Sequence, residues 1–316
     1  MPFDIENKLV VAVSSSAVFN MTEADSVFRS EGETAYRKYQ KERIDEPFEK
    51  GVAYPFIRRL LRLNTAYPEL SPIEVIVLSR NDPDSGQRFF RSCRHYNLDI
   101  TRGAFLEGKS PYPYIPAFNA SLFLSANDED VKKAIAAGMP AGLVLPTEVV
   151  DNEEENELRV AFDFDGVIAD DESESVFQKD TTNVNQFHDH EQAKRDEPHN
   201  PGPLADLLQK MSAFQRWEKK HVAENEGQQR LLRVAIVTAR NAPSNERLIT
   251  TLNAWGLEAV ELFLMGGIEK RRVLDVLQPH IFFEDQLKHL ETAAATVPSV
   301  HIPFGVTNQP KQVGQS

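Results

Sequence analysis

The sequence has a single cysteine and fewer basic than acidic residues. Cys93, in the predicted helical segment RSCRHY, excludes an intrachain disulfide and any cysteine-rich zinc site, and we interpret it as a buried, inert thiol. Lys and Arg total 35 against 48 Asp and Glu, so the formal net charge is −13. Nucleic-acid binding depends mainly on basic side chains that neutralise phosphates, so we expect this chain to bind no nucleic acid.

Long hydrophobic runs are also absent. No stretch approaches the roughly 18–20 apolar residues that a membrane helix needs, so no membrane partner is expected. The first residues, MPFDIENKLVV, lack the basic start and apolar run of a secretory signal, which predicts a cytoplasmic location. With 316 residues, 41% of them hydrophobic, the chain is long enough for about two domains.

The two halves of the chain carry similar patterns. A predicted solvated linker, DNEEEN at 151–156, separates residues 1–150 from residues 157–316. The predicted apolar strand LVVAVSSSAVF (9–19) matches LRVAFDFDGVI (158–168) at an offset of 149 residues. VIVLSRN (75–81) matches AIVTARN (235–241) at an offset of 160, and LFL (122–124) matches IFF (281–283) at an offset of 159. Further matches follow in the same order, which favours a tandem duplication. The alternative is a chance likeness between two alternations of strand and helix.

Each half alternates short apolar runs with longer amphipathic segments. Runs such as VIVL and VAIV are apolar at every position, as in parallel strands covered on both faces by helices. Residues 22–44 and 245–256 are predicted to be helices, the second of them ending at Gly256. The predicted fold class is therefore α/β, with a doubly wound parallel sheet in each half.

The sharpest chemical signal is Asp163-Phe164-Asp165-Gly166, directly after the predicted strand 158–162. Side chains two apart leave a strand on the same side, so both carboxylates point toward the edge where α/β sheets bind ligands. One carboxylate can attack an electrophile while the other donates and accepts a proton. A hard dication with oxygen ligands, Mg²⁺, would offset their charge. The alternative is a turn with two solvated aspartates.

Three later features follow apolar runs in the same way. Thr238 ends the run VAIV, Lys270 opens the predicted helix KRRVLDVL, and Glu284-Asp285 ends the run IFF. Each has an ordinary explanation, as a strand residue, an exposed helix lysine and a pair of acids at a helix start. Together they would bring a hydroxyl, an ammonium and a further carboxylate to the edge that carries Asp163.

With these motifs, the chain resembles the haloacid-dehalogenase-like phosphohydrolase superfamily, whose four motifs correspond to DFDGV, VTAR, the lysine of GGIEK, and FFED. This likeness covers residues 157 to about 305. Over nearly the whole chain, AVSSSAVF, VIVLSRNDPDSG, HYNLDITRGAF, FNASLFLSAN and AFDFDGVIADDESE resemble the bacterial 5′-nucleotidases related to the animal cytosolic type-I 5′-nucleotidase. The fold that the resemblance implies is a Rossmann-like parallel sheet with helices on both faces.

The resemblance also implies residue roles. Asp163 would be the nucleophile that forms an aspartyl-phosphate, and Asp165 the general acid and base. Thr238 would hold a phosphate oxygen and Lys270 would balance the charge of nucleophile and phosphate. Mg²⁺ would be bound by Asp163, by the backbone carbonyl of Asp165 and by Asp285, with Glu284 behind them. Many relatives carry another acid a few residues further on, where this chain has Lys288 and His289.

Between the first and second motifs the superfamily inserts a cap that selects the substrate, here predicted at about 171–230. A stacking aromatic with polar neighbours suits a nucleobase, which makes Phe187, His188 and Glu191 candidate substrate-binding residues. Arg240 and Asn241, after Thr238, complete the candidates in this half. Two alternatives stay open for the insert: a metal site formed by His188, His190 and His199, and a solvated polar loop.

The first half lacks the catalytic groups. At the positions of the four motif residues Asp163, Asp165, Thr238 and Asp285 it has Ser14, Ser16, Leu78 and Ala126. We therefore expect a non-catalytic copy that contributes to the substrate pocket or to a nucleotide effector site. Arg80, at a predicted strand end, is a candidate for binding phosphate, with an ordinary loop as the alternative.

The expected function is a Mg²⁺-dependent 5′-nucleotidase that converts a nucleoside 5′-monophosphate to nucleoside and phosphate through an aspartyl-phosphate. One alternative is a phosphatase for another small phosphorylated metabolite. The other is a nucleotide-sensing protein without activity, against which the complete motif set argues. The oligomeric state is left open, a homo-oligomer included.

Overall fold

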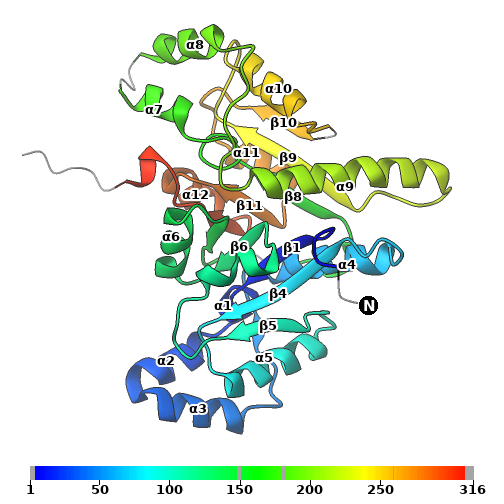
Figure 1. The fold of residues 1–316 in the computed structure, drawn as a ribbon, viewed down its shortest axis with the longest axis vertical. Helices are drawn as coiled ribbons and strands as arrows, with labels where there is room; N and C mark the ends of the chain where they lie inside the picture. Colours follow the sequence, from blue (N-terminus) through cyan, green and yellow to red (C-terminus); the bar gives the residue numbers. More distant parts are fainter. Residues whose placement is uncertain (1–3, 148–150, 180–182, 259, 310–316) are drawn as a thin grey trace, which may run out of the picture. The chain divides into compact units, whose positions relative to one another are not determined.

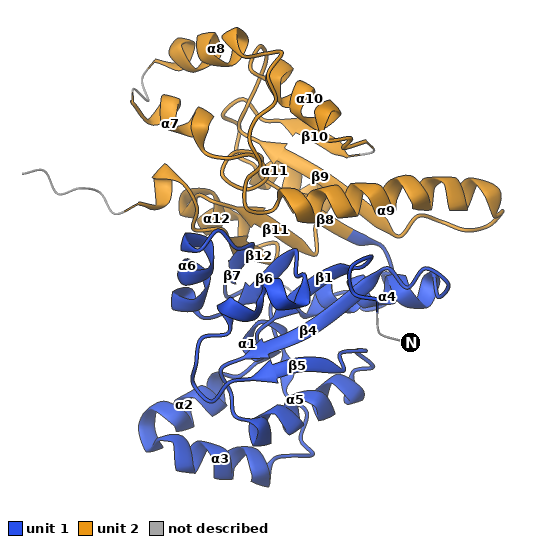
Figure 2. Ribbon diagram, viewed as in Figure 1, with its two compact units in different colours: residues 1–158 blue, residues 159–316 orange. Residues whose placement is uncertain are grey.

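The computed structural model of the protein describes residues 4–147, 151–179, 183–258 and 260–309. The chain divides into two compact units, residues 1–158 and 159–316 (Figure 2). The boundary lies just after the predicted linker at 151–156.

Unit 1 alternates strands and helices from its start (Figure 1). Its elements, in chain order, are β1 (Leu9–Val13), α1 (Ser15–Val18), β2 (Phe19–Asn20), α2 (Thr22–Glu31), α3 (Glu33–Glu42), β3 (Glu49–Lys50), α4 (Tyr54–Ala66), β4 (Ile73–Ser79), α5 (Pro83–His95), β5 (Arg102–Phe105), the 3₁₀ turns η1 (Tyr112–Tyr114) and η2 (Pro116–Phe118), β6 (Leu122–Ser125), α6 (Asp128–Ala136) and β7 (Ala141–Val144).

Unit 2 repeats this alternation. Its elements are β8 (Leu158–Phe162), α7 (Glu172–Lys179), α8 (Val184–Ala193), α9 (Ala205–Glu224), β9 (Leu232–Thr238), α10 (Asn245–Ala254), β10 (Glu261–Leu264), α11 (Arg271–Leu277), β11 (Ile281–Glu284), α12 (Leu287–Ala293), β12 (Ser299–His301) and η3 (Val306–Asn308).

The two units share one strand order. It is β7-β6-β1-β4-β5 in unit 1 and β12-β11-β8-β9-β10 in unit 2. The register also agrees, because Ala12 of β1 lies opposite Phe123 of β6, as Ala161 of β8 lies opposite Phe282 of β11. These are the residues that the sequence offsets pair with one another, so the matches mark equivalent positions and the structure has the arrangement that a tandem duplication predicts.

Each unit carries a helix pair between its first strand and the next large helix. In unit 1 this insert is α2 and α3, and its two ends are joined by the antiparallel pair β2–β3. In unit 2 it is α7 and α8, with an antiparallel bridge between Ala169 and Pro201 at the corresponding place. Of the segment predicted as a cap at about 171–230, α7 and α8 pack on one another, whereas α9 packs against β9 as α4 packs against β4.

The predicted buried strands are confirmed. Every residue of β1, β4, β6 and β8 is buried, which requires cover on both faces of the strands. In unit 1 alternate residues such as Val10, Ala12, Ile76 and Leu78 form one core cluster with residues of α6. The fold class is α/β, as predicted.

Two predicted elements differ in extent. The strand predicted at 9–19 ends at Val13, because the hydroxyl of Ser14 accepts a hydrogen bond from the backbone N–H of Ala17 (3.2 Å) and caps the helical turn α1. The helix predicted at 22–44 is interrupted at Gly32, whose φ of +84° lies in the region that glycine adopts most readily. The helix predicted at 245–256 is confirmed as α10, with Gly256 at a φ of +65° after its end.

The acidic segment predicted as a solvated linker is only partly solvated. Asp151 forms ion pairs with Arg58 and with the buried Arg59 of α4, and Glu153 pairs with Lys50. Its acids therefore anchor the segment to unit 1. No helix among the described residues is both long and apolar enough to cross a membrane.

Candidate active site

The end of β8 places Asp163 in a buried position at the carboxyl edge of the strands. Its backbone N–H donates to the carbonyl of Phe283 in β11 (2.8 Å), which continues the pairing of the two strands. The side chain of Asp163 is 5% exposed. In the same two strands, the rings of Phe162 and Phe283 stack with their centroids 5.0 Å apart.

Lys270 lies between two carboxylates. Its Nζ is 2.7 Å from Oδ2 of Asp163 and 2.7 Å from Oε2 of Glu284. Burial opposes the charge of Lys270, but the two carboxylates outweigh it and raise its pKa. The predicted meeting of Lys270 with the nucleophile position is thus present in the structure, and the lysine stays protonated at neutral pH.

Glu284 has more contacts than its sequence position suggests. It is fully buried and also accepts hydrogen bonds from Nδ1 of His289 (3.1 Å) and from the backbone N–H of Gln286 (3.1 Å). Burial raises its pKa, but Lys270 and His289 outweigh this effect and hold the pKa well below its usual value. His289, named from the sequence only as a departure from the common pattern, is therefore a partner of the buried carboxylate.

Asp285 has an oxygen without a partner. Its Oδ2 accepts a hydrogen bond from the hydroxyl of Thr307 (2.9 Å), whereas its buried Oδ1 has no hydrogen bond. Burial, and then the charges of Glu284 and Asp163, raise the pKa of Asp285 to about 10. A buried carboxyl group with an open oxygen beside two other carboxylates is expected to attract a cation.

These residues fit a magnesium ion. Asp163 and Asp285 offer carboxylate oxygens, the ligands that Mg²⁺ prefers, and the lone Oδ1 of Asp285 is free to bind it. Oxygen and nitrogen atoms of Asp163, Glu284 and His289 also lie within 4.8 Å of one another. Lys270 bridges that group, so a metal there would face an ammonium, and the side of Asp285 is the better place for the ion.

Gly166 makes room for this arrangement. It has a φ of +73°, and a Cβ built on it would lie 2.7 Å from Cγ of Asp285. The glycine of the DFDG motif thus allows both the turn after β8 and the close approach of the backbone to the carboxyl group.

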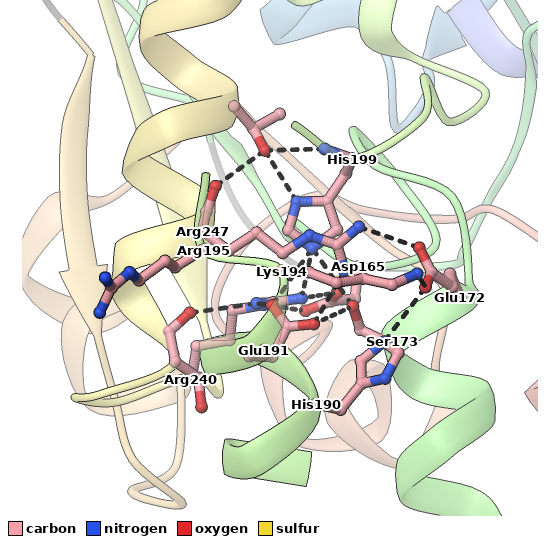
Figure 3. A network of polar contacts seen from close by, with 12 residues as sticks. Asp165, Glu172, Ser173, His190, Glu191, Lys194, Arg195, His199, Arg240 and Arg247 are labelled. Carbon is pink, nitrogen blue, oxygen red and sulfur yellow. Dashed lines mark hydrogen bonds and ion pairs between the residues drawn. The ribbon is translucent and has the colours of Figure 1, made fainter. Parts of the chain in front are cut away.

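Asp165 points into a second network, which Figure 3 shows. Its carboxylate is paired with Arg240 through two hydrogen bonds, of 2.6 Å from Nη2 and 2.8 Å from Nε. Arg240 also pairs with Glu191 of α8 and lies 3.1 Å from Nε2 of His199. Burial opposes the charge of Arg240, but Asp165 and Glu191 outweigh it and raise its pKa.

Glu191 is the centre of this network. It is fully buried and accepts hydrogen bonds from Ser173 (2.8 Å) and from Arg247 (3.1 Å) as well as from Arg240. Burial acts to raise its pKa, but His199 and Arg240 hold the pKa far below the usual range. The helix pair α7–α8 is therefore tied to α10 and to the loop after β9 by buried charges.

A more exposed rim surrounds that centre. Glu172 pairs with Arg247 (3.0 Å), Lys194 and His190. Despite partial burial, the hydrogen bonds from Lys194 and Arg247 lower its pKa to about 2. Arg247 and Ser173, which the sequence did not single out, belong to this network; their only sequence signal is a position in the insert or in the helix after the VTAR motif.

The other predicted site residues of unit 2 contact Arg240 or the loops around it. Thr238 is buried at the end of β9 and its hydroxyl oxygen accepts a bond from the N–H of Arg240 (3.3 Å). Phe187 has its ring 5.4 Å from Cζ of Arg240, and His188 contacts the hydroxyl of Ser244. Asn241 is exposed beside the Gly266 loop.

The metal-site alternative for the insert is not supported by the described residues. His188, His190 and His199 each have separate partners, namely Ser244, Glu172, and Thr251 with Glu191. They do not form a group that could hold one ion. In unit 1, Arg80 pairs with Asp130 through bonds of 2.6 and 2.7 Å, so its charge is balanced and its binding of phosphate stays a prediction.

The strand order and the covering helices define a Rossmann-like α/β protein, with a buried aspartate–lysine pair at the strand ends. This arrangement is consistent with a haloacid-dehalogenase-like fold. A family model described as 5′-nucleotidase matches residues 1–309. The chain belongs to the 5′-nucleotidase family.

A named relative agrees with this assignment. The chain is 32% identical over 294 residues to the human cytosolic 5′-nucleotidase 1B. The match covers 91% of this chain and 47% of the human protein, so the chain spans about half the length of the curated relative it matches.

Proposed function

We propose that the protein hydrolyses nucleoside 5′-monophosphates to nucleoside and phosphate through an aspartyl-phosphate. Family membership and the name of the human relative support the substrate class. The observation that carries the chemistry is the buried carboxylate of Asp163, held 2.7 Å from the ammonium of Lys270 at the strand ends. Burial and the charge of Glu284 raise the pKa of Asp163, and the ammonium of Lys270 opposes this by favouring the charged form that attacks phosphorus. A nucleotide sensor has no need for a nucleophile.

In the first step, an oxygen of Asp163 attacks phosphorus and the bond from phosphorus to O5′ breaks. Asp165, protonated at this stage, gives its proton to O5′ as the nucleoside leaves. Lys270 stabilises the charge of the reacting carboxylate and phosphoryl group, and Thr238 donates its hydroxyl hydrogen to a phosphoryl oxygen.

In the second step, water attacks phosphorus and the bond to the Asp163 oxygen breaks. Asp165 takes the proton from the water, which restores both aspartates and releases inorganic phosphate. Both oxygens of Asp165 are engaged by Arg240 in this structure, so proton transfer requires that Arg240 release at least one of them.

The carboxylates of Asp163 and Asp285 and the backbone carbonyl of Asp165 would hold Mg²⁺. The bound ion supplies positive charge that offsets the phosphoryl oxygens. The open Oδ1 of Asp285 supports this assignment.

The nucleoside would contact the insert α7–α8. Phe187 lies beside Arg240, the partner of Asp165. A nucleobase stacked on the Phe187 ring would therefore bring its nucleoside close to Asp165, which protonates O5′. A cytoplasmic location is part of the proposal and is supported by the relative, which is named as a cytosolic enzyme.

Phosphate release from a panel of nucleoside monophosphates and sugar phosphates, with Mg²⁺ present, tests the proposal. We expect nucleoside monophosphates to be preferred and Asp163→Asn to abolish turnover in a protein that is still folded. The matched control is Asp189→Asn, an exposed aspartate of α8, which should keep full activity. A preference for sugar phosphates would favour the metabolite phosphatase, and tight nucleotide binding without any turnover would favour the sensor.

A further inference from the structure

Unit 1 contains a cavity of about 480 Å³, within the usual range for small-molecule sites. It lies between the ends of β1, β4 and β6 and the helix pair α2–α3, and all of its lining residues belong to unit 1.

The cavity occupies the position that the active site occupies in unit 2. The N–H of Ser14 donates to the carbonyl of Leu124 (2.8 Å), as the N–H of Asp163 donates to that of Phe283 (2.8 Å). Ser14, Leu78 and Ala126 all line the cavity. They stand in place of the nucleophile, of Thr238 and of Asp285, so the cavity lies at the equivalent strand ends and lacks the reacting groups.

What remains is poorly suited to an anion. Five acidic and two basic residues line the cavity, an excess of three negative charges. One of the two basic residues, Arg80, is already paired through two hydrogen bonds with the buried Asp130. No lysine lines the cavity as Lys270 does the site of unit 2.

The helix starts offer no substitute. The first amides of α5 are capped by Asp82, through bonds of 2.9 Å from Asp84 and 3.2 Å from Ser85. Asn127 caps α6 in the same way (3.0 Å). Because the chain's own side chains take these donors, a phosphate would find mainly carboxylates around it.

The lining suits an uncharged ligand with a flat ring and several hydroxyl groups. Phe28 of α2 is 51% exposed and makes an edge-to-face contact with Tyr36 of α3, with ring centroids 5.7 Å apart. The buried hydroxyl of Tyr36 has Gln40 and Ser85 as polar neighbours but no hydrogen bond of ordinary geometry. The carboxylates are acceptors for hydroxyl and amino groups, and the rings are a surface for stacking.

We propose that this cavity of unit 1 binds an uncharged nucleoside, and binds it better than the corresponding 5′-monophosphate. The choice of a nucleoside among uncharged ligands rests on the proposed function, of which it is the product. The preference for an uncharged ligand rests on the lining alone. Unit 2 would then hydrolyse the nucleotide, and unit 1 would bind the nucleoside that is released.

The test is a binding titration of the full chain carrying Asp163→Asn, so that no ligand is consumed. The probes are adenosine, cytidine and their 5′-monophosphates. A second variant adds Phe28→Ala, whose exposed ring can be removed with little effect on folding, to be verified by an unchanged melting temperature. The matched control adds Phe187→Ala, which alters the aromatic residue in the insert of unit 2.

We expect at least one nucleoside to bind at a site that Phe28→Ala weakens roughly tenfold, as the loss of one stacking contact would. Phe187→Ala should leave that site unchanged, and the monophosphate should bind there at least about tenfold more weakly. Asp25→Asn with Glu107→Gln, which removes two lining charges, should narrow the gap between nucleoside and monophosphate.

Two results would overturn the proposal. One is the absence of any nucleoside binding that depends on Phe28. The other is a Phe28-dependent site that binds the monophosphate as tightly as the nucleoside. Phosphate release by the wild-type protein is measured separately, so an inactive protein with a Phe28-dependent nucleoside site would refute the proposed function and keep the binding site.

Discussion

Removal of Glu191 should destabilise unit 2 strongly, because it would strip a fully buried carboxylate from the network of Figure 3. Removing one partner of a buried ion pair typically costs about 3–5 kcal/mol. Arg240 would still have Asp165, and Arg247 would still have Glu172. Since neither guanidinium loses its last carboxylate, we expect Glu191→Ala to lower the free energy of unfolding by about 3 kcal/mol, near the lower end of that range.

Urea denaturation followed by tryptophan fluorescence measures this loss. Both tryptophans, Trp217 and Trp255, lie in unit 2, so the signal follows that unit alone. With a slope of roughly 1–3 kcal/mol per molar urea, a loss of about 3 kcal/mol lowers the midpoint by about 1–3 M.

The matched control is Lys194→Ala, which removes an exposed partner of Glu172 from the same network. A pair exposed to this degree is worth about 0–1 kcal/mol, so the midpoint should fall by less than about 1 M. Equal shifts for Glu191→Ala and Lys194→Ala would refute the argument that burial makes Glu191 the centre of the network.

Three further predictions concern other parts of the chain. In EDTA at pH 7, Asp285→Asn should raise the melting temperature. Folding raises the pKa of the Asp285 carboxyl group from 3.8 to about 10, so the folded wild-type protein loses stability as pH rises between these values, and the variant does not. Mg²⁺ should stabilise this variant less than the wild type. Gly166→Ala should lower turnover at least about tenfold through the clash with Asp285. Gly227→Ala has a similar positive φ of +87° but nothing within 4 Å, so it should cost only the backbone strain, about 1–2 kcal/mol in urea denaturation, and leave turnover unchanged. Cys93, whose pKa burial raises to about 12, should resist thiol reagents in the native protein and react after unfolding.

The meeting of the candidate catalytic groups at the strand ends was largely predictable from the sequence. Asp163 directly follows an apolar strand, Thr238 and Glu284 each end one, and the ends of neighbouring parallel strands meet at one edge. Local patterns of this kind place side chains well because strand ends and strand order leave little freedom. The two elements that were wrong in extent, at 9–19 and 22–44, depended on a capping hydroxyl and one glycine, which an apolar pattern does not reveal.

The partners of the catalytic groups were not predictable in this way. Arg240 and Glu191 were expected to bind substrate, whereas the structure pairs Arg240 with both Glu191 and Asp165. Arg240 is 75 residues from Asp165 in the sequence and 49 residues from Glu191. A charged residue in an insert looks the same in sequence whether it faces solvent or a buried arginine.

The amino-acid sequence by itself determined the α/β class, the duplicated order of strands and the set of groups at the end of β8, β9 and β11. Apolar runs and the spacing of polar residues after them are local properties, and local properties can be recognised along a chain. Only the tertiary structure decided which carboxylate meets which cation and that unit 1 keeps a cavity. Both depend on how the helix pairs pack over the strand ends, and that packing sets which charges leave water together.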